Sequence, residues 1–142
     1  MIRLLASLAL FVTVAVPAAA QTPPRPQLQL TRIEAYSTAS GNFTRYRFDV
    51  TNKSEYPAVL FAAAPSLPPC GTNTNSSRAW VDFFDARDKR LYGFCALGSP
   101  DHLGSIWFAL PEGTVPPSYV YIEIHDRQTG LKYRSNLAET SL

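Results

Sequence analysis

The sequence predicts an all-β protein, an antiparallel immunoglobulin-like β-sandwich of seven to eight strands. Several short segments alternate apolar and polar residues with a period of two, which is typical of half-buried strands. Aromatic residues form 12% of the chain, and 12 prolines divide it into segments that favour short strands joined by turns. Because each strand buries one stripe of side chains, two sheets must face each other, and a small β-barrel is the alternative.

Three strands are expected in the first half of the chain, over residues 28–37, 45–51 and 59–63. In the first of them the apolar positions change phase between Leu30 and Ile33, which indicates a β-bulge. The second alternates without a break and is the clearest strand of the chain. A long connection with three prolines follows over residues 65–78.

Five more strands are expected in the second half, over residues 79–85, 91–97, 106–110, 119–125 and 131–135. A short polar stretch separates the first two of these, which therefore form a hairpin. Residues 126–130 have the composition of a turn, so the last two strands form another hairpin. Residues 28–136 thus make one β-sandwich domain. Residues 137–142 show no periodicity and are expected to be a loose tail.

Residues 1–20 have the layout of a secretory signal peptide. A single arginine precedes an apolar run over residues 4–16, and three alanines precede a cut before Gln21. The apolar run is too short to span a membrane. The mature chain is therefore expected to be exported from a bacterial cell, as a periplasmic or secreted protein. Residues 21–27 then form a proline-rich leader, and the mature chain has no transmembrane segment.

The chain has two cysteines, Cys70 and Cys95, which are expected to form one disulfide in an oxidising compartment. Closing a loop of about 26 residues stabilises a fold by roughly 3 to 3.5 kcal/mol. A reactive thiol pair or half of a metal site is the other interpretation. Both are disfavoured because the spacing is long and neither histidine lies beside a cysteine. No metal site and no cofactor are expected.

The charges are nearly balanced, with 13 basic and 11 acidic residues in the chain. No run of like charge occurs, whereas a protein that binds nucleic acid usually gathers its basic residues on one face. The sequence therefore argues against a nucleic-acid partner.

The sequence shows no recognisable arrangement of catalytic residues. The two histidines, His102 and His125, each adjoin an aspartate, but neighbouring residues of an extended chain point to opposite faces. Neither pair therefore forms a catalytic dyad, and no catalytic residue is expected. A small hydrolase that uses Asp82 or Asp85 with His125 is one alternative, and it requires these side chains to converge in one pocket.

The sequence favours binding over catalysis, and four residues are candidates for a binding site. Asn73, Asn75 and Arg78 lie in a polar connection that suits hydrogen bonding to a ligand, and Trp107 is expected to face away from the core. Trp80 is expected in the core, as is usual for immunoglobulin-like domains. The sequence thus predicts a non-enzymatic binding module whose partner is another envelope protein. A carbohydrate-binding module that uses exposed aromatic residues is the alternative.

The second half of the chain contains three distinctive stretches, CGTNTNSSRAWVDFFDARDKRLYGFCAL, IWFALPEG and VYIEIHDRQTGLKYRSN. With them, residues 43–138 resemble a group of small, uncharacterised exported bacterial proteins. The resemblance implies an immunoglobulin-like β-sandwich, export from the cell and the Cys70–Cys95 disulfide. It assigns no catalytic residue.

Overall fold

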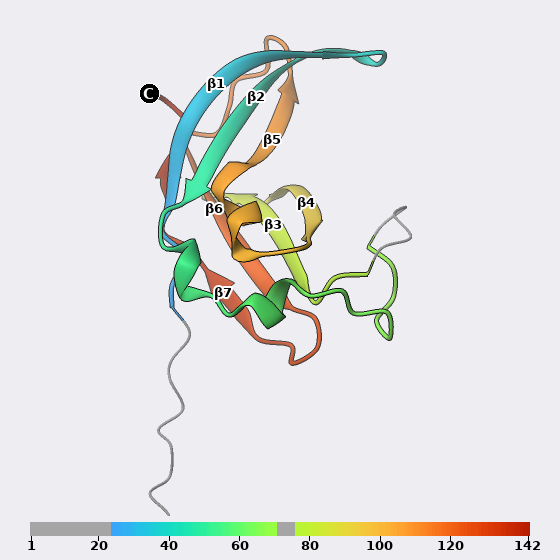
Figure 1. Ribbon diagram of the computed structural model, residues 1–142. Coiled ribbons are helices and arrows are strands. Elements are labelled where there is room, and N and C mark those ends of the chain that lie inside the picture. The colour runs from blue at the N-terminus through green and yellow to red at the C-terminus, as the bar shows by residue number, and fades with distance from the viewer. Residues whose placement is uncertain (1–23, 71–75) are drawn as a thin grey trace, which may run out of the picture.

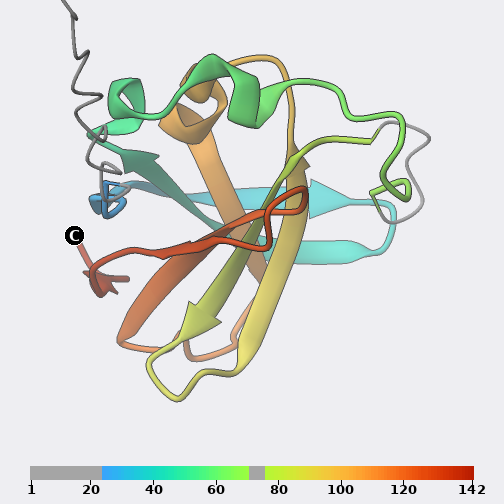
Figure 2. The same ribbon diagram turned by 90° about the horizontal axis from the view of Figure 1, so that it is seen from below.

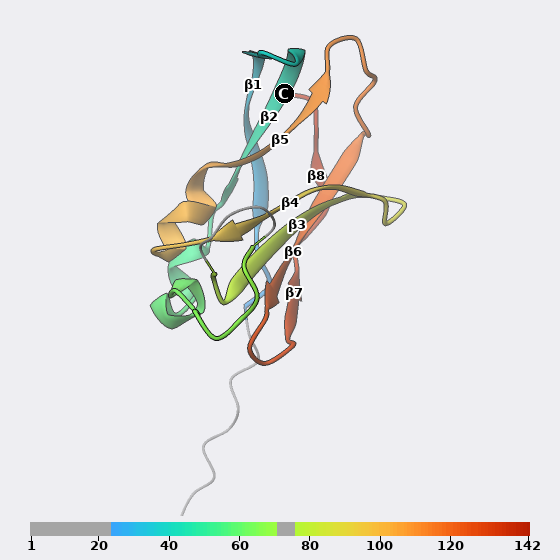
Figure 3. The ribbon, with the colours of Figure 1, turned by 90° about the vertical axis from the view of Figure 1, so that its right-hand side faces the viewer.

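Two antiparallel β-sheets face each other in the computed structural model, which describes residues 24–70 and 76–142. The expected signal peptide, residues 1–20, and the start of the leader lie outside these residues. The strands of the two sheets cross at a wide angle (Figure 2), and the side view separates the two layers (Figure 3). The β-sandwich predicted from the sequence is confirmed. The strands form two separate sheets instead of the small barrel considered as the alternative.

The first sheet has three strands: β1 (Leu28–Thr38), β2 (Gly41–Val50) and β5 (Ile106–Pro111). They lie in the order β1-β2-β5, so β1 is an edge strand. The register between β1 and β2 shifts between Leu30 and Arg32, which confirms the bulge expected from the change of phase. The tip of this hairpin projects beyond the rest of the domain (Figure 1).

The second sheet has five strands: β3 (Ala79–Asp85), β4 (Arg90–Ala96), β6 (Tyr119–Asp126), β7 (Lys132–Arg134) and β8 (Ala138–Glu139). The order is β4-β3-β6-β7, and β8 also pairs with β6. The sheet of β1, β2 and β5 thus faces the sheet that contains β3, β6 and β7. This is the immunoglobulin-like arrangement, with the fourth strand paired to the third.

The expected strand over residues 59–63 is wrong. Residues Ala58–Phe61 form a 3₁₀ helix, η2, directly after Pro57. Leu60 and Phe61 are neighbours and both are buried. A strand would point them to opposite faces, whereas the tight turn directs both into the core. Ala63 alone keeps a strand-like contact, an isolated bridge to Ser77.

Two further 3₁₀ helices lie in connections between strands, η1 (Lys53–Glu55) and η3 (Pro100–Ser105). Ser99 caps η3 by accepting a hydrogen bond from the Asp101 backbone N–H. Leu103 of η3 is fully buried. These connections therefore extend the core beyond the edges of the sheets.

The loose tail expected over residues 137–142 is also wrong. Ala138 is buried and pairs with Val120 of β6. Thr140 is buried as well, and its hydroxyl donates to the Pro117 carbonyl at 2.5 Å. The segment was missed because two alternating buried positions are too few to show a period.

The described end of the leader is attached to the domain. The Tyr56 hydroxyl donates to the Pro24 carbonyl at 2.7 Å, and the Arg25 guanidinium donates to the Ser135 carbonyl. Burial of the Tyr56 ring raises the pKa of its hydroxyl well above the usual range. The phenol therefore stays protonated and keeps donating to the leader.

Three phenylalanines form the centre of the core. Phe48 of β2, Phe83 of β3 and Phe108 of β5 are essentially inaccessible to solvent. The Phe83 ring centroid lies 5.5 Å from that of Phe48 and 5.3 Å from that of Phe108. Both sheets contribute to this cluster, so it joins the two layers.

Candidate functional site

Two hollows in the described surface are candidate binding sites. The first, here called the hairpin groove, lies between the β3–β4 turn and the β5–β6 connection. Its lining residues are Asp85, Ala86, Arg87, Lys89, Leu91, Leu110, Thr114, Val115, Pro116, Pro117, Ser118 and Tyr119. The second, here called the Trp80 pocket, lies on the outer face of the second sheet. Its lining residues are Leu67, Pro68, Trp80, His125 and Arg127.

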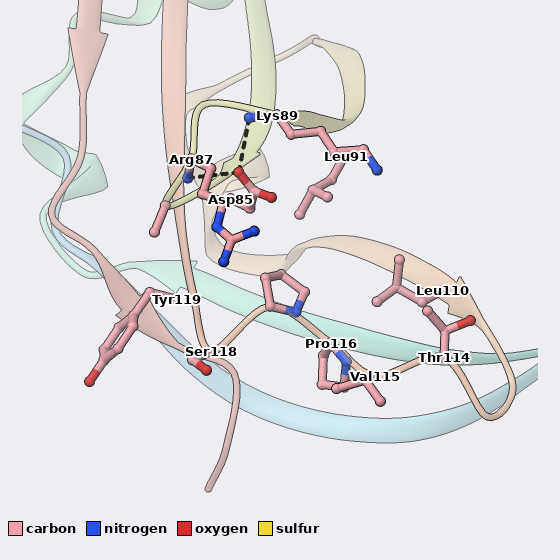
Figure 4. A pocket seen from close by; sticks show the side chains of 12 residues that line it. Asp85, Arg87, Lys89, Leu91, Leu110, Thr114, Val115, Pro116, Ser118 and Tyr119 are labelled. Atoms are coloured by element: carbon pink, nitrogen blue, oxygen red, sulfur yellow. Dashed lines mark hydrogen bonds between the residues drawn. The ribbon is translucent and has the colours of Figure 1, made fainter.

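The hairpin groove has a volume of about 480 Å³ and mixes apolar and charged side chains. Leu91 and Leu110 come from the two sheets, and Pro116 lies on the connection opposite the β3–β4 turn (Figure 4). The Arg87 guanidinium extends from that turn into the space between the two segments (Figure 4). The groove thus combines apolar side chains with cations on one rim.

Local chemistry of the β3–β4 turn places the rim cations. The Asp85 carboxylate accepts hydrogen bonds from the backbone N–H groups of Arg87 and Lys89, at 2.8 and 2.9 Å. Asp88 takes a left-handed backbone with φ of 63°, which completes the tight turn. Among the described residues, Arg87 and Lys89 are the two basic residues whose side chains have neither an ion pair nor a hydrogen bond within the chain.

The turn is also fixed from its other side. The Asp88 carboxylate accepts a hydrogen bond from the Tyr121 hydroxyl at 2.7 Å and pairs with Arg134 at 3.2 Å. Burial, with a smaller contribution from Asp88, raises the pKa of Tyr121 to about 12. The turn therefore presents Arg87 and Lys89 from a well-ordered base.

The opposite rim of the hairpin groove exposes apolar surface. Val115 is 87% exposed and Tyr119 is 43% exposed. Both residues also border a second hollow of about 330 Å³, on the side of the C-terminal residues. The segment from Val115 to Tyr119 is thus a ridge between two hollows, and the apolar side chain of Val115 is open to solvent on it.

Trp107 lies on the outer face of the first sheet, because its neighbours Ile106 and Phe108 point into the core. Its ring stacks on Tyr92 at 5.8 Å and meets the edge of Tyr36 at 5.5 Å. The Arg45 guanidinium lies 4.5 Å from the ring centroid. Trp107 therefore faces away from the core as expected, but side chains of the same chain already cover its ring.

Trp80 is not in the core, and the expectation that it would be is wrong. Val81 and Phe83 of β3 are fully buried, so the alternation of the strand places Trp80 on the outer face. Both faces of β3 carry aromatic residues, but Asp82 shares the face of Trp80, and a charged side chain favours the outer face. Trp80 lies across from Cys95 of β4 and His125 of β6.

One wall of the Trp80 pocket is a loop held by the Cys70–Cys95 disulfide, with Cα atoms 5.9 Å apart. The loop is light green at the right of Figure 1. The Arg127 guanidinium donates to the Ser77 carbonyl at 2.9 Å and to the Pro68 carbonyl, and it contacts the Cys70 sulfur at 3.1 Å. The expected disulfide is confirmed, and with Arg127 it fixes the wall of the pocket.

Replacing both cysteines by serine is expected to lower the free energy of unfolding by about 3 kcal/mol, because the unfolded chain regains the freedom of the closed loop. The measurement is urea unfolding of Cys70→Ser/Cys95→Ser beside the oxidised protein. Since neither cysteine belongs to the central hydrophobic cluster, the variant should keep a β-sheet circular-dichroism spectrum. Equal stability of the two proteins would contradict this role.

The side chain of Arg78, a predicted binding residue, is engaged within the protein and is not free to bind a ligand. Its guanidinium donates two hydrogen bonds to Asp126, both at 2.8 Å, and Asp126 is 2% exposed. Arg78, with hydrogen bonds from Thr129 and the Gln128 backbone, holds the pKa of the Asp126 carboxyl well below its usual range. The other two binding candidates, Asn73 and Asn75, lie outside the described residues.

The hydrolase alternative needs carboxylates near His125. Asp85 lines the hairpin groove and His125 the Trp80 pocket, and their strand positions are about 17 Å apart along β3 and β6. Asp82 pairs with Arg90 at 2.6 Å over Gly93, where a Cβ atom would collide with both side chains. Asp85 and His125 therefore do not converge.

Residues 24–70 and 76–142 contain no group of three or more His, Cys, Asp or Glu side chains placed to hold a metal ion. No helix within the same ranges is long and apolar enough to cross a lipid bilayer. Comparison with models of protein families, with curated proteins and with solved structures finds no match for the chain. The resemblance to exported bacterial proteins stays a prediction.

Sequence reasoning did not single out the hairpin groove. In the sequence, Arg87 and Lys89 fall in the short polar stretch between two expected strands, and Val115 falls between the strands expected over residues 106–110 and 119–125. The available indication was a valine in a stretch of glycine, threonine and proline, where an apolar side chain has no strand to bury it. The β3–β4 turn and the β5–β6 connection are far apart in the sequence, so their meeting in one groove could not be predicted from it.

Proposed function

We propose that the protein is an exported, non-enzymatic binding module that recognises another protein of the bacterial envelope. The hairpin groove carries the proposal, because it combines an exposed apolar ridge with two cations that have no partner in the described chain. Export is supported by the layout of residues 1–20 and is compatible with the disulfide.

The chemistry of the groove favours an extended segment with apolar and acidic side chains. Apolar side chains of the segment would cover Leu91, Leu110 and Val115, and burial of this surface supplies affinity. Carboxylates of the segment would pair with Arg87 and Lys89, which supplies orientation and rapid association. Asp85 is less available to oppose them, because its carboxylate is hydrogen-bonded within the turn.

The first test uses two sets of fluorescent nine-residue peptides, in which leucine or valine alternates with glutamate in one set and with lysine in the other. We expect the protein to bind the glutamate set in fluorescence polarisation. Arg87→Glu/Lys89→Glu is expected to weaken this binding at least about 10-fold, because it opposes like charges.

Arg32→Glu is the matched control, since Arg32 is an exposed cation on β1 in the other sheet and lines a different hollow. It should leave the affinity unchanged. Equal binding of the glutamate and lysine sets, or an equal loss in Arg32→Glu, would contradict the assignment of the groove. Absence of binding to the glutamate set would contradict it as well.

A further inference from the structure

We propose that the Trp80 pocket is a second binding site, separate from the hairpin groove, and that it takes an acidic sugar ring. The pocket has a volume of about 430 Å³, which is within the usual range of small-ligand sites. Three separate segments build it: the loop that ends at Cys70, strand β3, and the end of β6 with Arg127.

An indole ring provides the surface on which the ring would stack. Trp80 is half-buried on the outer face of β3, and Leu67 and Pro68 stand beside it as an apolar wall. The apolar C–H face of a sugar packs on such a ring, while hydroxyl groups at its edge need donors and acceptors. His125, across from Trp80 in the sheet, offers a polar ring at that edge.

The charge of the pocket selects an acid. Arg127 donates only to neutral groups, the carbonyls of Pro68 and Ser77 and the sulfur of Cys70, and it pairs with no carboxylate of the described chain. A carboxylate on the ligand would supply the missing counter-charge and accept a charge-assisted hydrogen bond from the Arg127 guanidinium.

The acidic residues nearby on the same face are already neutralised. Asp82 pairs with Arg90 at 2.6 Å, and Glu123 pairs with Lys132 at 2.8 Å. None of the residues that line the pocket is itself acidic. The pocket therefore presents a net positive charge beside an aromatic ring.

The pocket is held in shape before any ligand arrives. The disulfide fixes the end of the loop, and Arg127 joins the same loop to the start of β3. Gly93 lies beneath the Trp80 ring, so no side chain at that position lifts the indole from the sheet. A preformed wall and floor reduce the entropy lost on binding.

The test is a titration with the trisaccharide of α-1,4-linked galacturonic acid, with the neutral trisaccharide maltotriose as control. Trp107→Phe leaves Trp80 as the single tryptophan, so the fluorescence reports on this pocket alone. We expect a saturable change with the acidic trisaccharide and an affinity at least about 10-fold weaker for maltotriose. Absence of a change, or equal affinity for the two sugars, would overturn the proposal.

Variants locate the site, and calorimetry measures them because one of them removes the fluorophore. Trp80→Ala is expected to weaken binding at least about 10-fold, since it removes the stacking surface. The His125 side chain makes no contact that holds the loop, so His125→Ala should retain the fold. This variant should weaken sugar binding several-fold. Unchanged affinity in both variants would overturn the proposal. Arg87→Glu in the hairpin groove should leave sugar binding unchanged, so the two proposals fail independently.

Discussion

Phe83→Ala is expected to lower the free energy of unfolding by about 4 kcal/mol, the largest effect of any single substitution considered. Phe83 is completely buried and its ring meets Phe48 and Phe108 of the facing sheet. Its removal leaves a cavity between the two layers that neither sheet can close without moving the other. Urea unfolding at pH 7, followed by circular dichroism, measures the loss.

Phe84→Ala is the matched control, because it removes the same side chain from the next position of the same strand. Phe84 is on the outer face, half-buried, and stacks on Tyr121 at 5.2 Å. A loss of about 1 kcal/mol is expected there, from partial burial and one aromatic pair. Similar losses in the two variants would mean that the inner face of β3 has been assigned wrongly.

Asp126→Asn is expected to cost about 3 kcal/mol at pH 7. The substitution keeps the shape of the side chain but leaves the Arg78 guanidinium without its counter-charge in a largely buried site. Arg78 is partly exposed, so the effect is set at the lower end of the range for buried ion pairs. Asp82→Asn is the control, since its partner Arg90 is 54% exposed, and it should cost less than about 1 kcal/mol.

The pH dependence distinguishes a charge effect from a packing effect. The pKa of Asp126 is lowered by folding, so the unfolded chain binds its proton more readily than the folded one. The stabilisation by this carboxylate is complete above its ordinary pKa of 3.8 and is lost as the pH falls below that value toward the lowered pKa. Asp126→Asn should therefore unfold with a flatter pH dependence between about pH 4 and about pH 2. A parallel profile would contradict the ion pair as the cause.

Several strands could be predicted from the alternation of apolar and polar residues along them. The alternation of residues 45–51 and 119–125 gave their position, and even the bulge after Leu30 was visible as a change of phase. Residues 59–63 failed because consecutive apolar residues fit a buried strand and a buried turn equally well. Period alone cannot separate the two.

The sites depended on contacts that the sequence does not display. For Trp80, both faces of β3 carry aromatic side chains, and the prediction gave too little weight to Asp82 on the same face. The predicted binding residue Arg78 faces Asp126, 48 residues away along the chain. The hairpin groove likewise joins Arg87 with Val115, which only the fold brings to opposite rims.

The two proposed sites lie at opposite ends of β3. Asp85, at the end of this strand, borders the hairpin groove, while Trp80 near its start borders the other pocket. At about 3.4 Å per residue the two positions are about 17 Å apart. A protein segment and a sugar ring could therefore be held together without competing for the same surface.

The bulge after Leu30 also affects how copies of this protein behave at high concentration. Strand β1 ends the first sheet, and within the described chain its outer backbone pairs with no other strand. A flat, unpaired edge strand can pair with a strand from a second molecule and begin fibril growth. The kink at the bulge, together with the charges of Arg32 and Glu34 beyond it, makes this edge a poor seed for self-association.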